Sequence, residues 1–91
     1  MTEESSLKTL LAKYSTIQEF EAGKELYTYN QSANKIYFVI DGLIRIFVRN
    51  KEQETEIQRQ KTGDFVGESA FAADFYSSRA EVYIKTKLLE F

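Results

Sequence analysis

From Thr16 to Phe91, apolar residues come in short runs with a period of two, instead of the longer runs with a period near 3.6 that helices require. The segment RAEVYIKT, residues 79–86, alternates strictly and places Ala80, Val82 and Ile84 on one predicted face. Such runs recur about every 8 to 12 residues and are separated by Gly, Asn and Ser. This spacing predicts a mainly β fold, either a sandwich or a closed antiparallel roll.

The pair Asp41-Gly42 lies between two apolar runs and predicts a two-residue β-hairpin. The register of that hairpin predicts two inward rows, formed by Ile36, Phe38 and Ile40 before the turn and by Ile44, Ile46 and Val48 after it. Residues 55–60, TEIQRQ, contain only Ile57 as an apolar residue and predict an edge strand. Residues 87–91, KLLEF, predict a separate last strand.

The first fifteen residues have a different pattern. Leu7, Leu10, Leu11 and Tyr14 recur at helical spacing, so residues 1–15 predict a short amphipathic helix that packs on the roll. The 91 residues are enough for one domain, which we divide into this helix and a β-roll over residues 16–91.

Composition excludes several classes of function. The chain has no His and no Cys, which removes the commonest metal ligand, the usual general base and the thiol nucleophile, so we expect no catalytic residue, no metal site and no enzyme activity. The net charge of −2 and the lack of a basic run argue against direct contact with nucleic acid. The longest apolar run, residues 36–40, is far too short to cross a bilayer, so we expect no membrane partner and a cytoplasmic protein.

Residues 63–82 hold the main candidate site. Gly63-Asp64 predicts a bend, Phe65-Val66 a brief strand, and Gly67 precedes an alanine-rich segment that favours a short helix. Free backbone amides at residues 67–70 would attract an anion. Arg79 offers a planar fork for phosphate oxygens, and Glu68 can accept a hydrogen bond from a sugar hydroxyl. Together these groups predict a site for a sugar phosphate.

Four blocks, FEAGKELY, ANKIYFVIDGLIRIF, KTGDFVGESA and SSRAEV, resemble in sequence and order the cyclic-nucleotide-binding domain family of catabolite-activator-type regulators and kinase regulatory subunits. The resemblance implies an antiparallel, jelly-roll-like β-roll with a short helix in its phosphate-binding cassette. It also implies that Glu68 bonds the ribose 2′-hydroxyl and that Arg79 bonds the cyclic phosphate. The implied ligand-binding residues are completed by backbone amides of Gly67, Glu68, Ser69, Ala70 and Ala80.

In the same resemblance, Ala80 stands where members that prefer cGMP often carry Thr or Ser, which favours cAMP as the effector. The implied function is that of a ligand-sensing module, the sensor half of a bacterial transcription regulator. The sequence ends where the family has a C-terminal lid helix, so we expect a chain truncated before that helix.

A second function stays open at this point. The interval from Glu68 to Arg79 is slightly longer than the family's usual one, which fits a member that has lost nucleotide binding and serves as a dimerisation or docking scaffold. Exposed apolar surface or the missing helix could then form a homodimer. The base of the effector and the output domain are not determined by the sequence.

Overall fold

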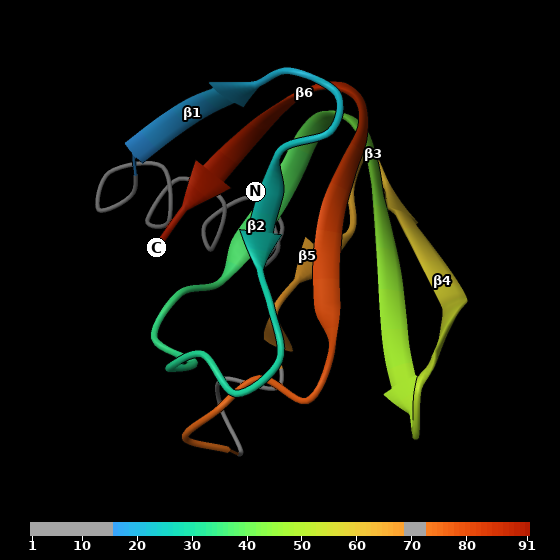
Figure 1. Cartoon of the computed structure of the whole chain (residues 1–91). Coiled ribbons are helices and arrows are strands. Elements are labelled where there is room, and N and C mark those ends of the chain that lie inside the picture. Colours follow the sequence, from blue (N-terminus) through green and yellow to red (C-terminus); the bar gives the residue numbers. More distant parts are fainter. Residues whose placement is uncertain (1–15, 69–72) are drawn as a thin grey trace.

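The computed structural model describes residues 16–68 and 73–91 (Figure 1). Within these ranges the chain forms one antiparallel sheet with the neighbour order β1-β6-β3-β4, while β2 pairs with β6 and β5 pairs with β3. The strands are β1 (Thr16–Phe20), β2 (Glu25–Tyr27), β3 (Tyr37–Asn50), β4 (Gln53–Lys61), β5 (Phe65–Val66) and β6 (Arg79–Glu90). The predicted mainly β, antiparallel roll is confirmed. The helix predicted for residues 1–15 and most of the helix predicted after Gly67 lie outside the described residues.

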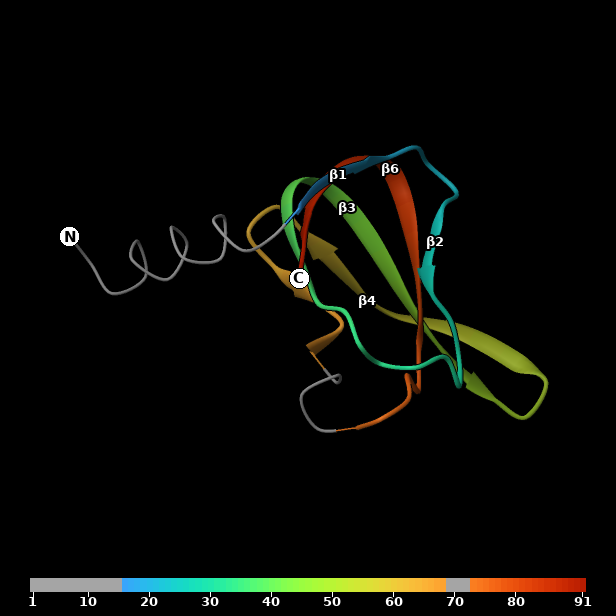
Figure 2. The same cartoon turned by 90° about the vertical axis from the view of Figure 1, so that its left-hand side faces the viewer.

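The sheet curls because its two longest strands, β3 and β6, pair along most of their length and bend together (Figures 1 and 2). Their register shifts three times, between Val39 and Asp41, between Asp41 and Leu43, and between Leu43 and Ile44. Such bulges strengthen the local twist and let one strand serve both halves of a roll.

The hairpin predicted at Asp41-Gly42 is wrong, because β3 runs through both residues without reversing. Gly42 has a φ of 142°, and a side chain there would overlap Thr86, whose Cβ would lie 2.6 Å from the added Cβ. The Thr86 hydroxyl accepts a hydrogen bond from the Leu43 N–H at 3.1 Å. The glycine is therefore needed for the close approach of β6 to the bend in β3, and not for a turn.

The tight connection lies further on, between β3 and β4. Asn50 pairs with Gln53, and Lys51 has a φ of 60° at the tip. As predicted, β4 is an edge strand, and Ile57 is 55% exposed.

Because β3 does not reverse at Asp41-Gly42, the side chains that it buries differ in part from the predicted inward rows. Before the bend, Tyr37 and Val39 are buried, whereas Phe38 and Ile40 are only half-buried. After the bend, Ile44 and Ile46 are buried as predicted, and Val48 is half-buried. The buried hydrophobic residues of the described chain are Tyr27, Ile36, Tyr37, Val39, Ile44, Ile46, Phe47, Val66, Tyr76, Ala80, Val82 and Leu88.

The last strand, β6, joins two predicted strands into one, since it continues from Arg79 through the predicted separate strand at the end of the chain. Ala80 and Val82 are fully buried, which confirms their predicted face. Ile84 departs from the prediction and is 49% exposed, because it lies where the register between β3 and β6 shifts.

Candidate functional site

A hollow of about 380 Å³ lies on the inner side of the roll and is the candidate site. Its apolar wall comes from β3, β4 and β5, and the Gly67-Glu68 and Ser77-Ser78 segments complete its rim. The lining residues are Tyr27, Ile46, Val48, Ile57, Gln58, Gln60, Phe65, Val66, Gly67, Glu68, Ser77 and Ser78. We call this hollow the inner pocket.

Gly67 lies at the rim of the inner pocket, at a position that requires glycine. It has a φ of 85°, a conformation that side chains disfavour. A Cβ at this position would also lie 3.0 Å from the backbone carbonyl oxygen of Lys35 and 3.6 Å from the Tyr27 ring. The chain therefore turns out of β5 against the loop before β3, and Glu68 follows directly at the rim.

Tyr76 fixes the other side of the rim. Its ring stacks on the Tyr27 ring with centroids 3.9 Å apart, and its hydroxyl donates a hydrogen bond of 2.5 Å to the Lys35 carbonyl. Its backbone N–H donates to the Gln31 carbonyl at 2.9 Å. Because Tyr76 is buried and held on three sides, the next two residues, Ser77 and Ser78, are placed beside the inner pocket.

The structure does not bring Arg79 to this pocket. Arg79 lies opposite Phe47 in the register of β3 and β6, whereas Ala80 lies opposite Ile46, which lines the pocket. Because side chains alternate along a strand, Arg79 lies on the outer face of the sheet. The guanidinium lies 4.3 Å from the centroid of the Phe47 ring, with its side chain 17% exposed.

On that outer face, Arg79 is held by carboxylates. Its Nε and one terminal nitrogen donate to Glu54 at 2.9 and 2.6 Å, and its other terminal nitrogen donates to Glu81 at 2.8 Å. Tyr29 donates a further bond of 2.8 Å to Glu54. The hydrogen bonds that Glu54 accepts from Arg79 and then from Tyr29 lower the pKa of Glu54 to about 2, and the bonds that Arg79 donates to Glu54 raise the pKa of Arg79. We call these four residues the outer clamp.

The predicted site residues are thus divided. Gly67 and Glu68 line the inner pocket, Arg79 belongs to the outer clamp, and Ala80 is buried within the sheet between Tyr27 of β2 and Ile46 of β3. Ser69 and Ala70 lie outside the described residues. Arg79 is not among the residues that line the inner pocket with Gly67 and Glu68, and ligand binding by the predicted site residues stays a prediction.

Sequence reasoning missed the pocket residues that come from other elements: Tyr27, Ile46, Val48, Ile57, Gln58, Gln60, Ser77 and Ser78. One signal for the placement of Arg79 was available. The alternation that predicted Ala80 and Val82 as inward also predicts that Arg79 and Glu81 share the opposite face.

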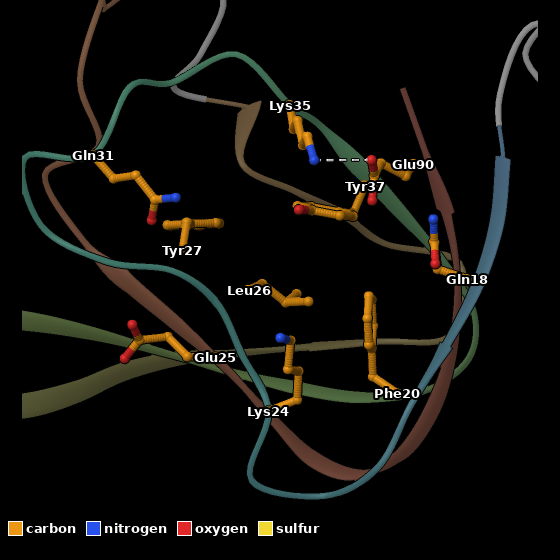
Figure 3. Close-up of a pocket in the computed structure, with 10 residues that line it drawn as sticks. All are labelled: Gln18, Phe20, Lys24, Glu25, Leu26, Tyr27, Gln31, Lys35, Tyr37 and Glu90. Atoms are coloured by element: carbon orange, nitrogen blue, oxygen red, sulfur yellow. Dashed lines mark ion pairs between the residues drawn. The ribbon is translucent and has the colours of Figure 1, made fainter.

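A second hollow, of about 420 Å³, lies between β1, β2 and the loop that leads into β3 (Figure 3). Phe20, Leu26 and Tyr37 supply apolar surface, and Lys35 forms an ion pair of 3.1 Å with Glu90 at its edge. None of the predicted ligand-binding residues lines this hollow.

The described residues contain no helix long and apolar enough to span a bilayer and no cluster of three acidic side chains suited to a metal ion.

The described residues thus form an antiparallel roll with a hollow between its inner face and the glycine-bounded segment after β5. The profile of one family, the cyclic nucleotide-binding domain, matches residues 17–91, and the chain belongs to that family. A search of curated proteins gave no match.

Solved structures share the fold. The c-di-GMP responsive global regulator CLP from Xanthomonas campestris has a TM-score of 0.87 at 20% identity, over 98% of this chain and 44% of that chain. The catabolite activator protein of Thermus thermophilus has a TM-score of 0.85 at 22% identity, over 100% of this chain and 43% of that one. A cyclic nucleotide-binding-like protein from Brucella abortus has a TM-score of 0.78 at 27% identity, over 91% and 72%. The chain therefore spans less than half the length of the two regulators.

Proposed function

We propose that this domain is a non-enzymatic sensor that binds a cyclic nucleotide in the inner pocket. The observation that carries the proposal is the inner pocket itself, in which an apolar wall on β3 and β4 faces the Gly67-Glu68 rim. A hollow that combines an apolar wall with polar side chains suits a ligand with a flat base and a polar sugar. Membership of the family supports the same ligand class.

In this proposal the cassette residues have distinct roles. The Glu68 carboxylate accepts a hydrogen bond from a ribose hydroxyl, and the backbone at Gly67 lets the ligand approach closely because no side chain intervenes. Ser69 and Ala70, which lie outside the described residues, are proposed to bind the ligand through their backbone amides. Arg79 is assigned to the outer clamp and not to the phosphate, because its three donor nitrogens already face Glu54 and Glu81.

We propose cAMP in preference to cGMP as the effector. The preference rests on Ala80, which offers no side-chain hydroxyl where members of the family that prefer cGMP often carry one. Calorimetric titration with the two cyclic nucleotides separates them: tighter binding of cGMP would reverse this assignment and leave the pocket proposal intact.

We also propose that the domain is the sensor half of a bacterial transcription regulator. Two of the similar structures are regulators, the Xanthomonas global regulator and the Thermus catabolite activator, and this chain spans 44% and 43% of their lengths. A DNA-binding output domain would then belong to the remaining part of the parent protein, and a lid helix would be supplied after β6. Binding of the parent protein to DNA with and without cAMP tests this role.

The pocket proposal is tested with two isoleucines of similar exposure. Ile57 is 55% exposed and lines the inner pocket, whereas Ile84 is 49% exposed and does not line it. Ile57→Ala should weaken cAMP binding about tenfold, because it removes part of the apolar wall, whereas Ile84→Ala should leave binding unchanged. The measurement is titration calorimetry up to millimolar ligand. Equal losses in both variants, or no saturable binding by the unaltered chain, would refute the proposal.

The scaffold function is kept as a second candidate because one observation favours it. The arginine that resembles the family's phosphate ligand is held on the opposite face, and large apolar side chains such as Ile17 and Phe75 are 64% and 57% exposed. A concentration-dependent dimer in analytical ultracentrifugation, together with no thermal shift from cAMP, would favour the scaffold. A ligand-dependent shift would favour the sensor.

A further inference from the structure

Two large apolar residues of β6, Tyr83 and Ile84, are both exposed although they are neighbours in a strand. The register shift between Leu43 and Ile44 puts Ile84 opposite Leu43, so these two side chains share a face of the sheet. That face is the outer one, because Ile44, the next residue of β3, is buried in the core. The Tyr83 ring lies there too, with its centroid 5.1 Å from the guanidinium carbon of Arg45. The shift in register therefore leaves two adjacent residues 44% and 49% exposed on the outer face.

The edge strand β4 adds two cations to the same face. Arg59 lies opposite Arg45, and Lys61 lies opposite Leu43. The guanidinium carbon of Arg59 is 4.9 Å from the centroid of the Tyr83 ring, so this ring lies close to two guanidinium groups. We call six residues of this area the cationic patch: Leu43, Arg45, Arg59, Lys61, Tyr83 and Ile84.

The cationic patch has more hydrogen-bond donors than acceptors. Glu56 accepts from Arg45 at 3.1 Å and from the Nε of Arg59 at 2.6 Å. The Nε of Arg45 is buried and has no hydrogen-bond partner, and the Lys61 ammonium forms no ion pair with a described residue. Even when Asp64 is counted, whose carboxylate accepts from the Lys61 backbone N–H at 2.9 Å, three cations face two carboxylates. The patch is therefore positive in a chain whose net charge is −2.

The outer clamp, on the same face, differs in this respect. Its arginine, Arg79, donates three hydrogen bonds to Glu54 and Glu81. In the cationic patch, by contrast, the side chain of Arg59 is 50% exposed and its terminal nitrogens donate to no described group. Donors suited to a carboxylate are thus free in the cationic patch and engaged in the outer clamp.

The combination of free cations and exposed apolar side chains determines the kind of partner. Arginine and tyrosine are enriched in protein interfaces and among the residues that contribute most to binding. Carboxylates of a partner complement Arg59 and Lys61, while an apolar side chain beside them can pack on Tyr83 and Ile84. A nucleic acid suits the patch less well, because the chain as a whole is acidic and would repel a polyanion.

We infer that the cationic patch is a docking surface for an acidic peptide segment of a partner protein, in which carboxylates alternate with apolar side chains. The inference goes beyond the proposed function, because the patch lies on the face opposite the inner pocket. Its test needs no cyclic nucleotide, so the two proposals can fail separately.

Fluorescence anisotropy with the 91-residue chain and a short labelled peptide of alternating Glu and Leu tests the inference. We expect saturable binding that weakens as salt is added, because the contact is between exposed charges. A peptide with Ser in place of Leu should bind at least about tenfold more weakly, and a peptide with Lys in place of Glu should not bind. No saturable binding of the Glu-Leu peptide at millimolar concentration, or equal binding of the Lys peptide, would overturn the inference.

Two exposed arginines give a matched pair of variants that locates the contact. The guanidinium carbon of Arg59 lies 4.9 Å from the Tyr83 ring, and that of Arg49, outside the patch, lies 4.4 Å from the Tyr29 ring. Arg59→Ala should weaken binding of the Glu-Leu peptide at least about tenfold, whereas Arg49→Ala should change it less than about twofold. Equal losses in the two variants would refute the docking surface.

The apolar part of the contact is tested in the same way. Ile84→Ser should weaken peptide binding, whereas Ile17→Ser, at a residue of β1 that is 64% exposed, should not. Thermal melts establish that the variants fold. Equal effects of the two substitutions would overturn the inference, as would a single-stranded RNA that binds more tightly than the peptide and loses affinity in Arg59→Ala.

Discussion

Neighbouring residues of β6 lie on opposite faces of the sheet because side chains alternate along a strand. Ala80 is fully buried on the inner face, while Arg79 and Glu81 form an ion pair of 2.8 Å on the outer face. Its residue type and the family resemblance predict that Arg79 binds phosphate, whereas in the structure its guanidinium is hydrogen-bonded to Glu54 and Glu81 on the outer face. A motif assigned from residue types must therefore agree with the strand parity before it identifies a binding residue.

Gly67 offers a prediction at the scale of one residue. Gly67 and Gly63 have similar φ values, 85° and 94°, but an added Cβ meets the Lys35 carbonyl only at Gly67, and nothing within 4 Å at Gly63. Gly63→Ala should therefore cost about 1 kcal/mol of unfolding free energy from backbone strain alone, and Gly67→Ala about 2 to 3 kcal/mol. Urea unfolding measures both. Equal costs would show that the contact with Lys35 does not restrict residue 67.

At the scale of elements, the outer clamp joins parts of the sheet that are remote in sequence. Glu54 belongs to the edge strand β4, Arg79 to β6, and Tyr29 to the loop after β2. The edge strand has no buried apolar residue of its own, since its single apolar side chain, Ile57, is 55% exposed. Its position therefore depends on hydrogen bonding to β3 and on this clamp.

The clamp predicts a dependence of stability on pH. Because the pKa of Glu54 falls from 4.5 to about 2 on folding, its contribution is present above pH 4.5 and is lost as the pH falls toward 2. Glu54→Gln should reduce the loss of stability over this acid window and lower stability at neutral pH. Thermal melts between pH 2 and 7 measure the effect, with Glu52→Gln on the same hairpin tip as the control. An acid profile that is the same for Glu54→Gln and the unaltered chain would show that the clamp is not what stabilises β4.

How much of the molecule could be read from the sequence also differs between elements. The alternation in residues 79–82 predicted the inward face of β6 correctly, and the sparse apolar content of residues 55–60 predicted the edge strand. The bend in β3 could not be predicted, because Asp-Gly is also typical of a hairpin, and the need for Gly42 comes from Thr86, which is 44 positions away. The inner pocket was only half predicted, because its wall comes from strands that are brought together by that bend.

At the scale of the whole molecule, the inner pocket and the outer clamp lie on opposite faces of one sheet. The inner face lines the inner pocket, where we propose that the ligand binds, and the outer face holds the arginine and its carboxylates. The two strands β3 and β6 supply residues to both faces. These two strands run the length of the molecule (Figure 1).

The central claim is that ligand binds on the inner face and not at Arg79, and nuclear magnetic resonance tests it most directly. Titration of the isotopically labelled chain with cAMP should shift the backbone amide signals of Gly67, Glu68, Ser77 and Ser78, which line the inner pocket. The side-chain Nε–H signal of Arg79 should stay in place, because that group remains bonded to Glu54. A large shift of the Arg79 signal, with the four pocket amides unmoved, would contradict the account.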